Sequence, residues 1–197
     1  MFLPVLFVIY LVLALAIPAI RLRRSTGSFG IVAFDHSHER WQRVISGSVS
    51  LCIAALVLWA IEYWVLGPGP LAIWPMPHRV KWFGLALFAG GAGLTFAAQA
   101  QMGDSWRIGI DSKPTDLITT GLFRFLRNPI FAGALVTLCG VVVMAPAYFS
   151  VGLWIVVCAL LNLQVRAEER HLVRLHGQAY RNYAQNSGRF IPRLRQG

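Results

Sequence analysis

Five apolar runs divide the chain, and polar, mostly basic segments separate them. An α-helix needs roughly 20 apolar residues to cross a ~30 Å hydrocarbon core, and the longer runs reach that length. Only Pro146 and its neighbours separate the last two runs, which predicts an antiparallel helical hairpin. We therefore predict an all-α fold, an integral-membrane bundle of about five helices in one domain, 1–197. The runs cover about residues 2–20, 44–66, 80–101, 129–145 and 148–165, with polar regions at 102–128 and 166–197.

Composition and charge support this interpretation. Apolar residues make up 56% of the 197 residues and charged residues 13%, and the mean hydropathy is +0.58, which is not typical of a soluble domain. Segments 21–43, 102–128 and 166–197 contain 5, 4 and 7 lysines and arginines, whereas the loop between the second and third runs has only Arg79 and Lys81 at its edge. The positive-inside rule then predicts a protein of the cytoplasmic membrane, N-terminus outside and C-terminus inside. No nucleic-acid-binding motif accompanies the net charge of +10, so nucleic acid is not an expected partner.

Two groups of metal-binding residue types do not form a recognisable site. Cys52, Cys139 and Cys158 lie within apolar runs, and their spacing indicates neither a disulfide nor a zinc site. The segment Asp35-His-Ser-His-Glu39 could contribute ligands, but nothing elsewhere matches it in spacing, so we interpret it as a solvated or headgroup-level loop. We predict no metal. Glu62 lies between two tryptophans that are typical of an interfacial belt, and we give it a structural role by default.

The third run contains a stripe of small residues. Ala89, Gly93 and Ala97 repeat every four residues, so they share one face of a helix. Small residues let helix backbones approach closely in a membrane. We expect a neighbouring helix to pack along this stripe.

A short polar collar, residues 119–131, precedes the fourth run. Arg124 and Arg127 are three residues apart, so they share a face if this piece is helical. Pro129 suits the first turn of the helix that follows, where its missing N–H needs no partner. Two guanidinium groups at a membrane entrance could hold an anion bidentately.

The fifth run continues into a charged segment without a helix breaker, and we predict one helix reaching about Tyr183. Glu168 and Glu169 lie on or beside its apolar faces, and a stripe of arginines four residues apart suits anionic headgroups (Arg166, Arg170 and Arg174). If the hairpin closes, both acids come near the arginines of the collar. The pattern has two interpretations: a salt-bridge network, or a clamp in which acids bind the ammonium and arginines the carboxylate of a zwitterionic ligand.

Three blocks in this half of the chain resemble the isoprenylcysteine carboxyl methyltransferase family, which is related to the membrane phospholipid methyltransferases. They are Thr119-Thr-Gly-Leu-Phe-Arg-Phe-Leu-Arg-Asn-Pro-Ile-Phe-Ala-Gly133, Arg166-Ala-Glu-Glu169 and Gly177-Gln-Ala-Tyr-Arg-Asn-Tyr183. They occur in the expected order over roughly residues 100–195. The resemblance implies an integral-membrane methyltransferase that uses S-adenosylmethionine without a Rossmann domain. It implies a hydrophobic or lipid-linked acceptor that enters sideways between helices.

The same resemblance assigns residues to roles. It implies a cofactor pocket between the last helices and the C-terminal tail. A carboxylate or thiolate acceptor is already ionised and needs no general base, so we expect Arg107 or Arg124 to orient it. Asn128 stands where the family usually has histidine and Phe131 where many members have tyrosine, so the acceptor class stays open, and asparagine cannot act as a base. Trp106 is the expected fluorescence reporter. The implied cofactor-binding residues are Arg127, Asn128, Pro129, Phe131, Arg166, Glu168, Glu169, Tyr180 and Tyr183.

Two other hypotheses fit the same sequence. One is a non-catalytic membrane scaffold or permeation module in which the acids and arginines only tie helix ends together. The other is a phospholipid-binding surface made by the arginine stripe alone. The acceptor atom, whether oxygen, sulfur or nitrogen, and the oligomeric state stay open.

Overall fold

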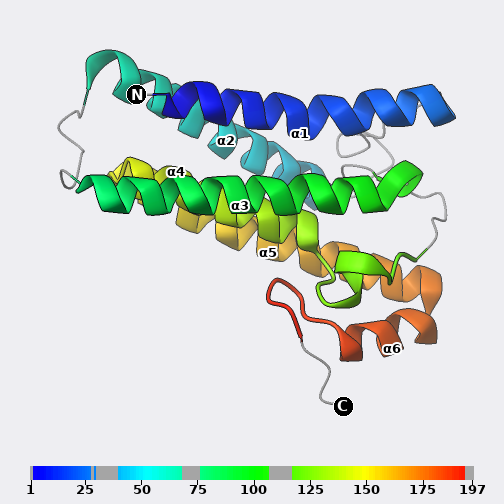
Figure 1. Ribbon diagram of the computed structural model, residues 1–197. Helices are drawn as coiled ribbons and strands as arrows, with labels where there is room; N and C mark the ends of the chain where they lie inside the picture. The colour runs from blue at the N-terminus through cyan, green and yellow to red at the C-terminus, as the bar shows by residue number, and fades with distance from the viewer. Residues whose placement is uncertain (1, 28, 30–39, 68–75, 107–116, 194–197) are drawn as a thin grey trace.

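A computed structural model describes residues 2–27, 29, 40–67, 76–106 and 117–193, and all regular structure within these ranges is helical (Figure 1). This confirms the prediction of an all-α fold. The helices are α1 (Leu3–Thr26), α2 (Arg40–Leu66), α3 (His78–Met102), α4 (Pro129–Met144), α5 (Tyr148–His176) and α6 (Gln178–Asn186). Two 3-10 turns, η1 (Gly103–Ser105) and η2 (Gly121–Arg124), follow α3 and precede α4.

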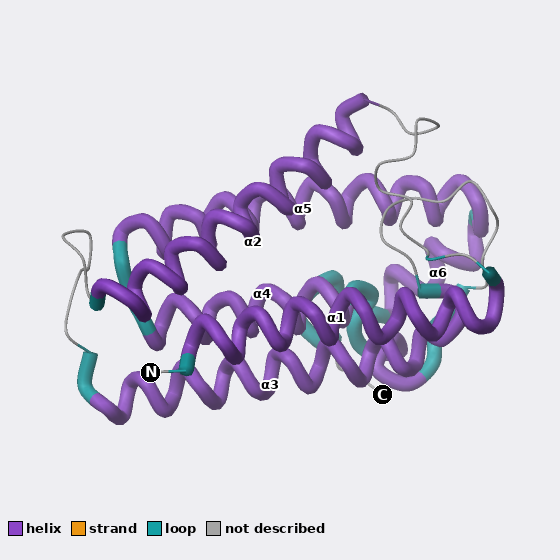
Figure 2. The backbone as a smooth tube through the Cα atoms, turned by 90° about the horizontal axis from the view of Figure 1, so that it is seen from above, coloured by secondary structure: helices purple, strands orange, loops and turns teal. Residues whose placement is uncertain are grey.

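Helices α1 to α5 form an elongated bundle, and α6 lies against its side near one end, next to the end of α5, with the C-terminal tail (Figures 1 and 2). We call this the collar end, where α1 finishes and α4 begins. Helices α1, α3 and α5 and the 43–66 part of α2 are each long and apolar enough to cross a membrane. Helix α4 has 16 residues and a length of about 24 Å, so its crossing of a ~30 Å core stays a prediction.

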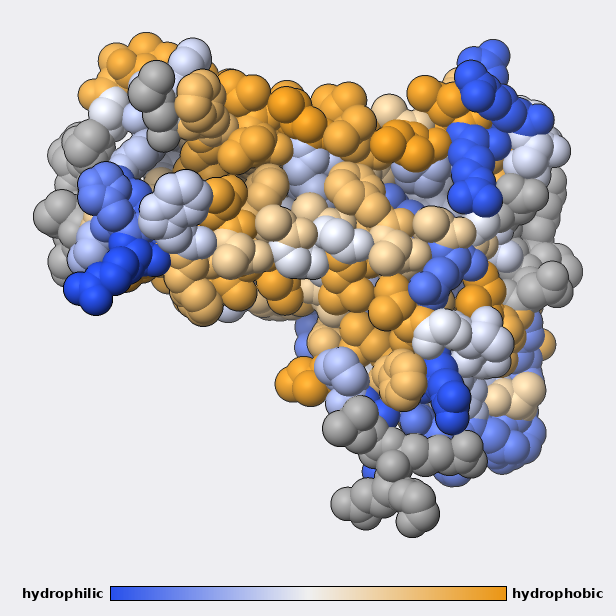
Figure 3. Space-filling model, in the orientation of Figure 1, coloured by the Kyte–Doolittle hydropathy of each residue, from blue (hydrophilic) through white to orange (hydrophobic). Residues whose placement is uncertain are grey.

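The outer surface of the bundle is strongly apolar. Large hydrophobic side chains on α1 and α2 are exposed, among them Val12, Leu51 and Leu58. Apolar side chains cover much of the long helices in the space-filling view, and hydrophilic residues gather at the ends (Figure 3). Such a surface would be costly in water and suits hydrocarbon, which agrees with the membrane helices predicted from the sequence.

Close backbone packing joins α3 to α4, the most extensive helix contact in the described residues. Gly91 lies against Gly133, and Gly84 lies against Gly140. On each helix the two glycines are seven residues apart, so the two contacts lie along one face. A Cβ atom on Gly91 would lie 2.6 Å from the Gly133 carbonyl oxygen, and only glycine permits that approach.

The small-residue stripe predicted to pack is therefore the wrong one. Ala89, Gly93 and Ala97 are exposed, and a Cβ atom on Gly93 would meet nothing within 4 Å. The physical reason lies in the partner: the glycines of α4 repeat every seven residues, and α3 matches them with its own glycines of that spacing. A four-residue repeat in α3 alone does not reveal which face has a partner.

Polar contacts and an aromatic side chain hold α1 against the bundle. Gln99 Nε2 donates to the Ala14 carbonyl at 2.8 Å, and the Tyr10 hydroxyl lies 3.3 Å from Thr95 Oγ1. At the collar end Trp106 is buried in a small cluster with Ala19, Leu22, Met102 and Ile130. The residue expected to report on ligand binding therefore anchors η1 between α1 and the start of α4.

Helix α5 ends earlier than predicted. It stops at His176, Gly177 takes a positive φ of 55°, and α6 then begins in a new direction (Figure 1). The prediction of one helix continuing to Tyr183 is wrong, because glycine adopts this backbone conformation at little cost and ends the helix there. The apolar part of α5 ends at Val165, so residues 166–176 extend beyond the predicted span.

Candidate functional site

The centre of the site is the carboxylate of Glu169, on the extension of α5 beyond its apolar part. Arg127 Nε donates to its Oε1 at 2.9 Å. Arg189, in the C-terminal tail, donates to Oε2 from Nη2 at 2.6 Å and from Nε at 3.0 Å. Burial would raise the pKa of Glu169, but the bonds and charges of Arg189 and Arg127 outweigh it and hold the pKa below its usual value. Glu169 is thus ionised and neutralised by two arginines.

The C-terminal tail pairs with the end of the collar and completes this network. Arg127 N–H donates to the Gly188 carbonyl at 2.7 Å, and Gly188 N–H donates to the Phe125 carbonyl at 3.0 Å. The Arg127 guanidinium also donates to the carbonyls of Ala184, at 2.6 Å, and Ser187. A Cβ atom at Gly188 would overlap the Ile191 carbonyl, so this turn of the tail requires glycine.

Asn128 belongs to the same network. Its Nδ2 lies 3.3 Å from Glu169 Oε1 and 3.4 Å from the Arg189 carbonyl. Asn128 also stands at the N-cap position of α4, although its side chain makes no capping hydrogen bond. Helix α4 begins at Pro129 as predicted, because the proline ring has no N–H to leave unpaired in the first turn. The polar groups before α4 therefore face α5 and the tail.

The collar turn η2 is held from two sides. Gln101 Oε1, at the end of α3, accepts a hydrogen bond from Leu122 N–H at 2.8 Å, and the Tyr183 hydroxyl of α6 donates to the Phe123 carbonyl at 2.7 Å. Arg124 ends the turn and is exposed, with its guanidinium 5.7 Å from the Phe125 ring centre. The expectation that Arg124 and Arg127 share a helix face is wrong, because the helical turn ends before the backbone pairs with the tail.

Glu168 differs from its neighbour, because no ion-pair partner for it lies among the described residues. Its one hydrogen bond comes from Gln164 Nε2 at 3.0 Å. Burial raises the pKa of Glu168 to about 7; the Gln164 bond opposes this shift and the charge of Glu169 adds to it. A buried carboxyl without a cation is thus half ionised near neutral pH.

Gln164 is itself incompletely satisfied. Its side chain is 7% exposed, and its Oε1 has no hydrogen-bond partner in the described part of the chain. Val157, Leu161, Gln164 and Glu168 follow one another at helical spacing on α5, and the first two belong to the apolar core. The interior face of α5 therefore changes from apolar to polar at the collar end, with acceptors that a cationic ligand would satisfy.

The two tyrosines predicted for the site lie on α6. Tyr180 is buried, and its ring centre is 5.8 Å from that of Tyr183. Burial, and then the charge of Glu169, raises the pKa of Tyr180, and burial raises that of Tyr183 to about 12. Both phenols are neutral at physiological pH, so Tyr183 acts as a hydrogen-bond donor that positions the collar.

Other predicted residues lie away from this centre. Arg166 is exposed and donates to Asn162 Oδ1 at 2.8 Å, and it forms no ion pair with Glu169. Phe131 packs against the main apolar core of the bundle. Arg107 and the loop with Asp35 and Glu39 fall outside the described residues. Where side chains are described, no three His, Cys, Asp or Glu residues gather as a metal site would require.

The sequence reasoning missed Arg189, Gln164 and Gln101. Arg189 lies in an irregular tail, where no periodicity indicates a partner. Gln164 offered a signal, since an amide four residues before an acid on one helix can hydrogen-bond to it. Gln101 ends an apolar run and was counted only as its boundary.

Comparisons with known proteins agree with this architecture. The chain is similar to a methanethiol S-methyltransferase of Pseudomonas deceptionensis, with 24% identity over 197 residues that cover 93% of this chain and 74% of that protein. Its fold is similar to a solved eukaryotic intramembrane Ras methyltransferase, isoprenylcysteine carboxyl methyltransferase, with a TM-score of 0.58 and 18% identity. That match covers 91% of this chain and 60% of that one, so the chain spans about three fifths of the structure it resembles.

A family profile decides the assignment. The profile described as phospholipid methyltransferase matches residues 80–179, which include α3, the collar, α4, α5 and the start of α6. This range contains Arg127, Asn128, Gln164 and both glutamates of the site. With its apolar helices and its similarity to membrane methyltransferases, the chain is an integral membrane protein, and it belongs to the phospholipid methyltransferase family.

Proposed function

We propose that the protein transfers a methyl group from S-adenosylmethionine to a hydrophobic or lipid-linked acceptor. The observation that carries the proposal is the pair of Gln164, which is buried, and Glu168, which is partly buried: an unbonded amide oxygen beside a carboxyl without a cation among the described residues. They lie one helical turn apart at the collar end, next to the arginine-bonded Glu169.

The residues present fit this cofactor. S-adenosylmethionine carries an ammonium group, a sulfonium and a carboxylate. Glu168 and Gln164 Oε1 would accept hydrogen bonds from the ammonium, and each charge-assisted bond contributes about 1.5–3 kcal/mol. Arg127 and Arg189 supply the positive charge that a carboxylate needs, since they outnumber the one acid between them.

When bound, the cofactor supplies a methyl group already activated on a sulfonium. The protein then has to align the acceptor and exclude water. Glu168 would give up its proton to hold a cation, and Asn128 would donate a hydrogen bond without taking part in proton transfer. The bonds of Gln101 and Tyr183 to η2 hold the collar between α3 and α6.

The acceptor is proposed from its chemistry. The names of the two similar proteins refer to a thiol and to a carboxyl group, which are both nucleophilic once ionised. Arg124 is exposed at the end of η2, where it would orient such an anion at the membrane surface, a role proposed also for Arg107. An amine acceptor would also suit a phospholipid methyltransferase, but the positive charge of these arginines would not help to bind an amine. The collar end is proposed to face the cytoplasm.

A non-catalytic scaffold is the alternative that the Glu169 network supports, because two arginines and one acid can tie helix ends without binding anything. It does not account for Gln164 and Glu168. A structural pair would complete its own hydrogen bonds.

The test uses purified full-length protein with methyl-labelled S-adenosylmethionine and a membrane extract. We expect cofactor binding, a labelled lipid-soluble product, and affinity at least about tenfold lower in Glu168→Gln, from the loss of one charge-assisted bond. Glu62→Gln, at an exposed acid of α2, is the matched control and should bind as the wild type does. Absence of cofactor binding in the wild-type protein would refute the proposal.

A further inference from the structure

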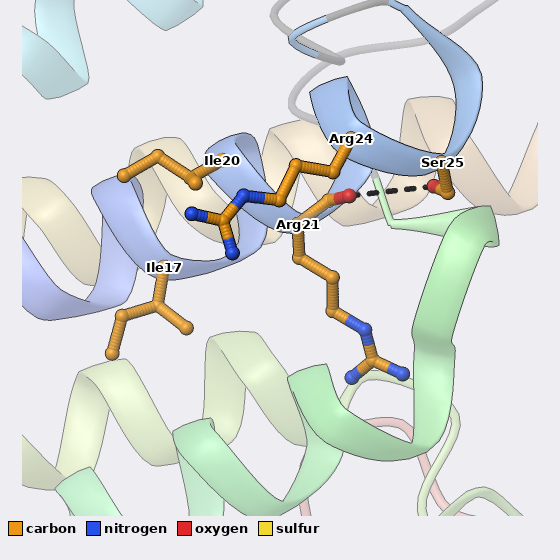
Figure 4. A pocket seen from close by; sticks show the side chains of 5 residues that line it. All are labelled: Ile17, Ile20, Arg21, Arg24 and Ser25. Carbon is orange, nitrogen blue, oxygen red and sulfur yellow. Dashed lines mark hydrogen bonds between the residues drawn. The ribbon is translucent and has the colours of Figure 1, made fainter.

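A groove of about 490 Å³ lies on α1, away from Glu168 and Glu169 in the sequence and on a different helix. It is lined by Ile17, Ile20, Arg21, Arg24 and Ser25, which are three or four residues apart and share one face. Figure 4 shows Arg24 reaching back beside Ile20 and Ile17, while Arg21 extends to the other side. The groove thus combines two isoleucines with two arginines, and the Arg24 guanidinium lies beside the isoleucines (Figure 4).

The two arginines of the groove have no acidic partner among the described residues. Arg23, between them in sequence, differs: its guanidinium lies over the Phe29 ring, 4.6 Å from the ring centre. The Ser25 hydroxyl faces the helix backbone and donates to the Leu22 carbonyl at 3.2 Å. Among the described residues, the groove therefore presents positive charge and no carboxylate that could bind a cationic group.

The groove lies where an apolar surface becomes a basic one. Ile17 and Ile20 are about half exposed on a helix long and apolar enough to cross a membrane, and the arginines begin directly after them. In the space-filling view, the apolar surface along α1 gives way to hydrophilic side chains at the collar end (Figure 3). In a bilayer, this is the level at which acyl chains meet phosphate groups.

We propose that this groove binds one anionic phospholipid, with its phosphate between Arg21 and Arg24 and the first part of an acyl chain against Ile17 and Ile20. A soluble anion would leave the isoleucines uncovered. A zwitterionic lipid would bring a cationic headgroup to a groove that has no acid among its described lining residues. The site does not depend on the proposed methyl transfer, although Leu22 of the same helix packs with Ile130 at the start of α4.

The test measures binding of fluorescent phosphatidylglycerol to the purified full-length protein in neutral detergent. Arg21→Gln and Arg24→Gln should each weaken binding roughly fivefold, from the loss of one headgroup contact. Arg23→Gln removes the same charge from the same helix end and should change binding less than about twofold, since its guanidinium is engaged with Phe29. Equal effects of all three variants would show general attraction of lipid and would overturn the site.

Two further comparisons separate the lipid from its parts. Phosphatidylcholine with the same chains should bind at least about fivefold more weakly than phosphatidylglycerol. Glycerol phosphate should compete poorly, and Ile17→Ala with Ile20→Ala should weaken the intact lipid only. Effective competition by glycerol phosphate would mean a simple anion site, and equal binding of both lipids would mean a purely apolar groove; either result contradicts the proposal.

Discussion

Affinity for S-adenosylmethionine should rise with pH between about 6 and 8, because Glu168 must lose a proton before it can hold a cation. Its pKa of about 7 reflects burial without a cationic partner. Glu169, the nearest other titrating group, has a lowered pKa and stays ionised throughout this range. The proton released on binding therefore comes from Glu168.

The size of the effect follows from the pKa. With a pKa of about 7, roughly a tenth of the carboxyl groups are ionised at pH 6 and roughly nine tenths at pH 8, so affinity rises about tenfold. The direction of the pKa shift fixes the direction of the change in affinity. The raised pKa keeps the Glu168 carboxyl protonated at low pH when no ligand is bound, and a bound cation favours its ionised form. An acid with an ordinary pKa would give a flat profile over the same range.

Isothermal titration calorimetry at about pH 6, 7 and 8, in two buffers of different ionisation enthalpy, measures both the affinity and the proton release. The amino group of the cofactor titrates near pH 8, so each wild-type value is divided by the Glu168→Gln value at the same pH. The ratio should rise with pH, and the variant should release no proton from this position. A constant ratio would refute the role given to Glu168.

Three further predictions concern stability. Glu169→Gln leaves the buried guanidinium of Arg127 without its counter-charge and should cost on the order of 2 kcal/mol or more, seen as a lower Tm in detergent, whereas Glu62→Gln should leave the Tm unchanged. Gly91→Ala pushes a methyl group into α4 and should lower the free energy of unfolding by about 1–3 kcal/mol in denaturant. Gly93→Ala, on the exposed face of the same helix, should be neutral or slightly stabilising. Equal losses of stability in the two variants would contradict the described packing. Gly188→Ala places a Cβ atom against the Ile191 carbonyl and should detach the tail, so protease cleavage after Arg189 should accelerate; unchanged cleavage would argue against the tight turn.

The sequence predicted the bundle well because a bilayer constrains length and polarity strongly. Helices α2, α3 and α4 coincide with their predicted runs to within a few residues, and Pro129 begins α4 as its chemistry requires. Hydropathy says little about which face of a helix has a partner. The packing face of α3 was therefore misjudged, since it depends on glycines in α4 that lie far away in sequence.

The candidate site was predicted in part. The expected approach of Glu169 to Arg127 is present, because both residues flank the same end of an antiparallel hairpin. Arg189 was not foreseen, since it reaches Glu169 through an irregular tail that pairs with residues 125–127. The break at Gly177 had a visible signal in the glycine itself. The assigned functional roles of these residues stay predictions.

The glycine contact between α3 and α4 has a mechanical consequence for the whole protein. Where the two backbones are in direct contact there are no side chains to rearrange, so we expect α3 and α4 to move together as a rigid pair. Helix α2 is the least buried of the helices long enough to span, with 22% of its most apolar stretch covered. If the acceptor enters from the bilayer as proposed, we expect α2 to be the helix that moves to admit it, because it is the least covered, while α3 and α4 stay together.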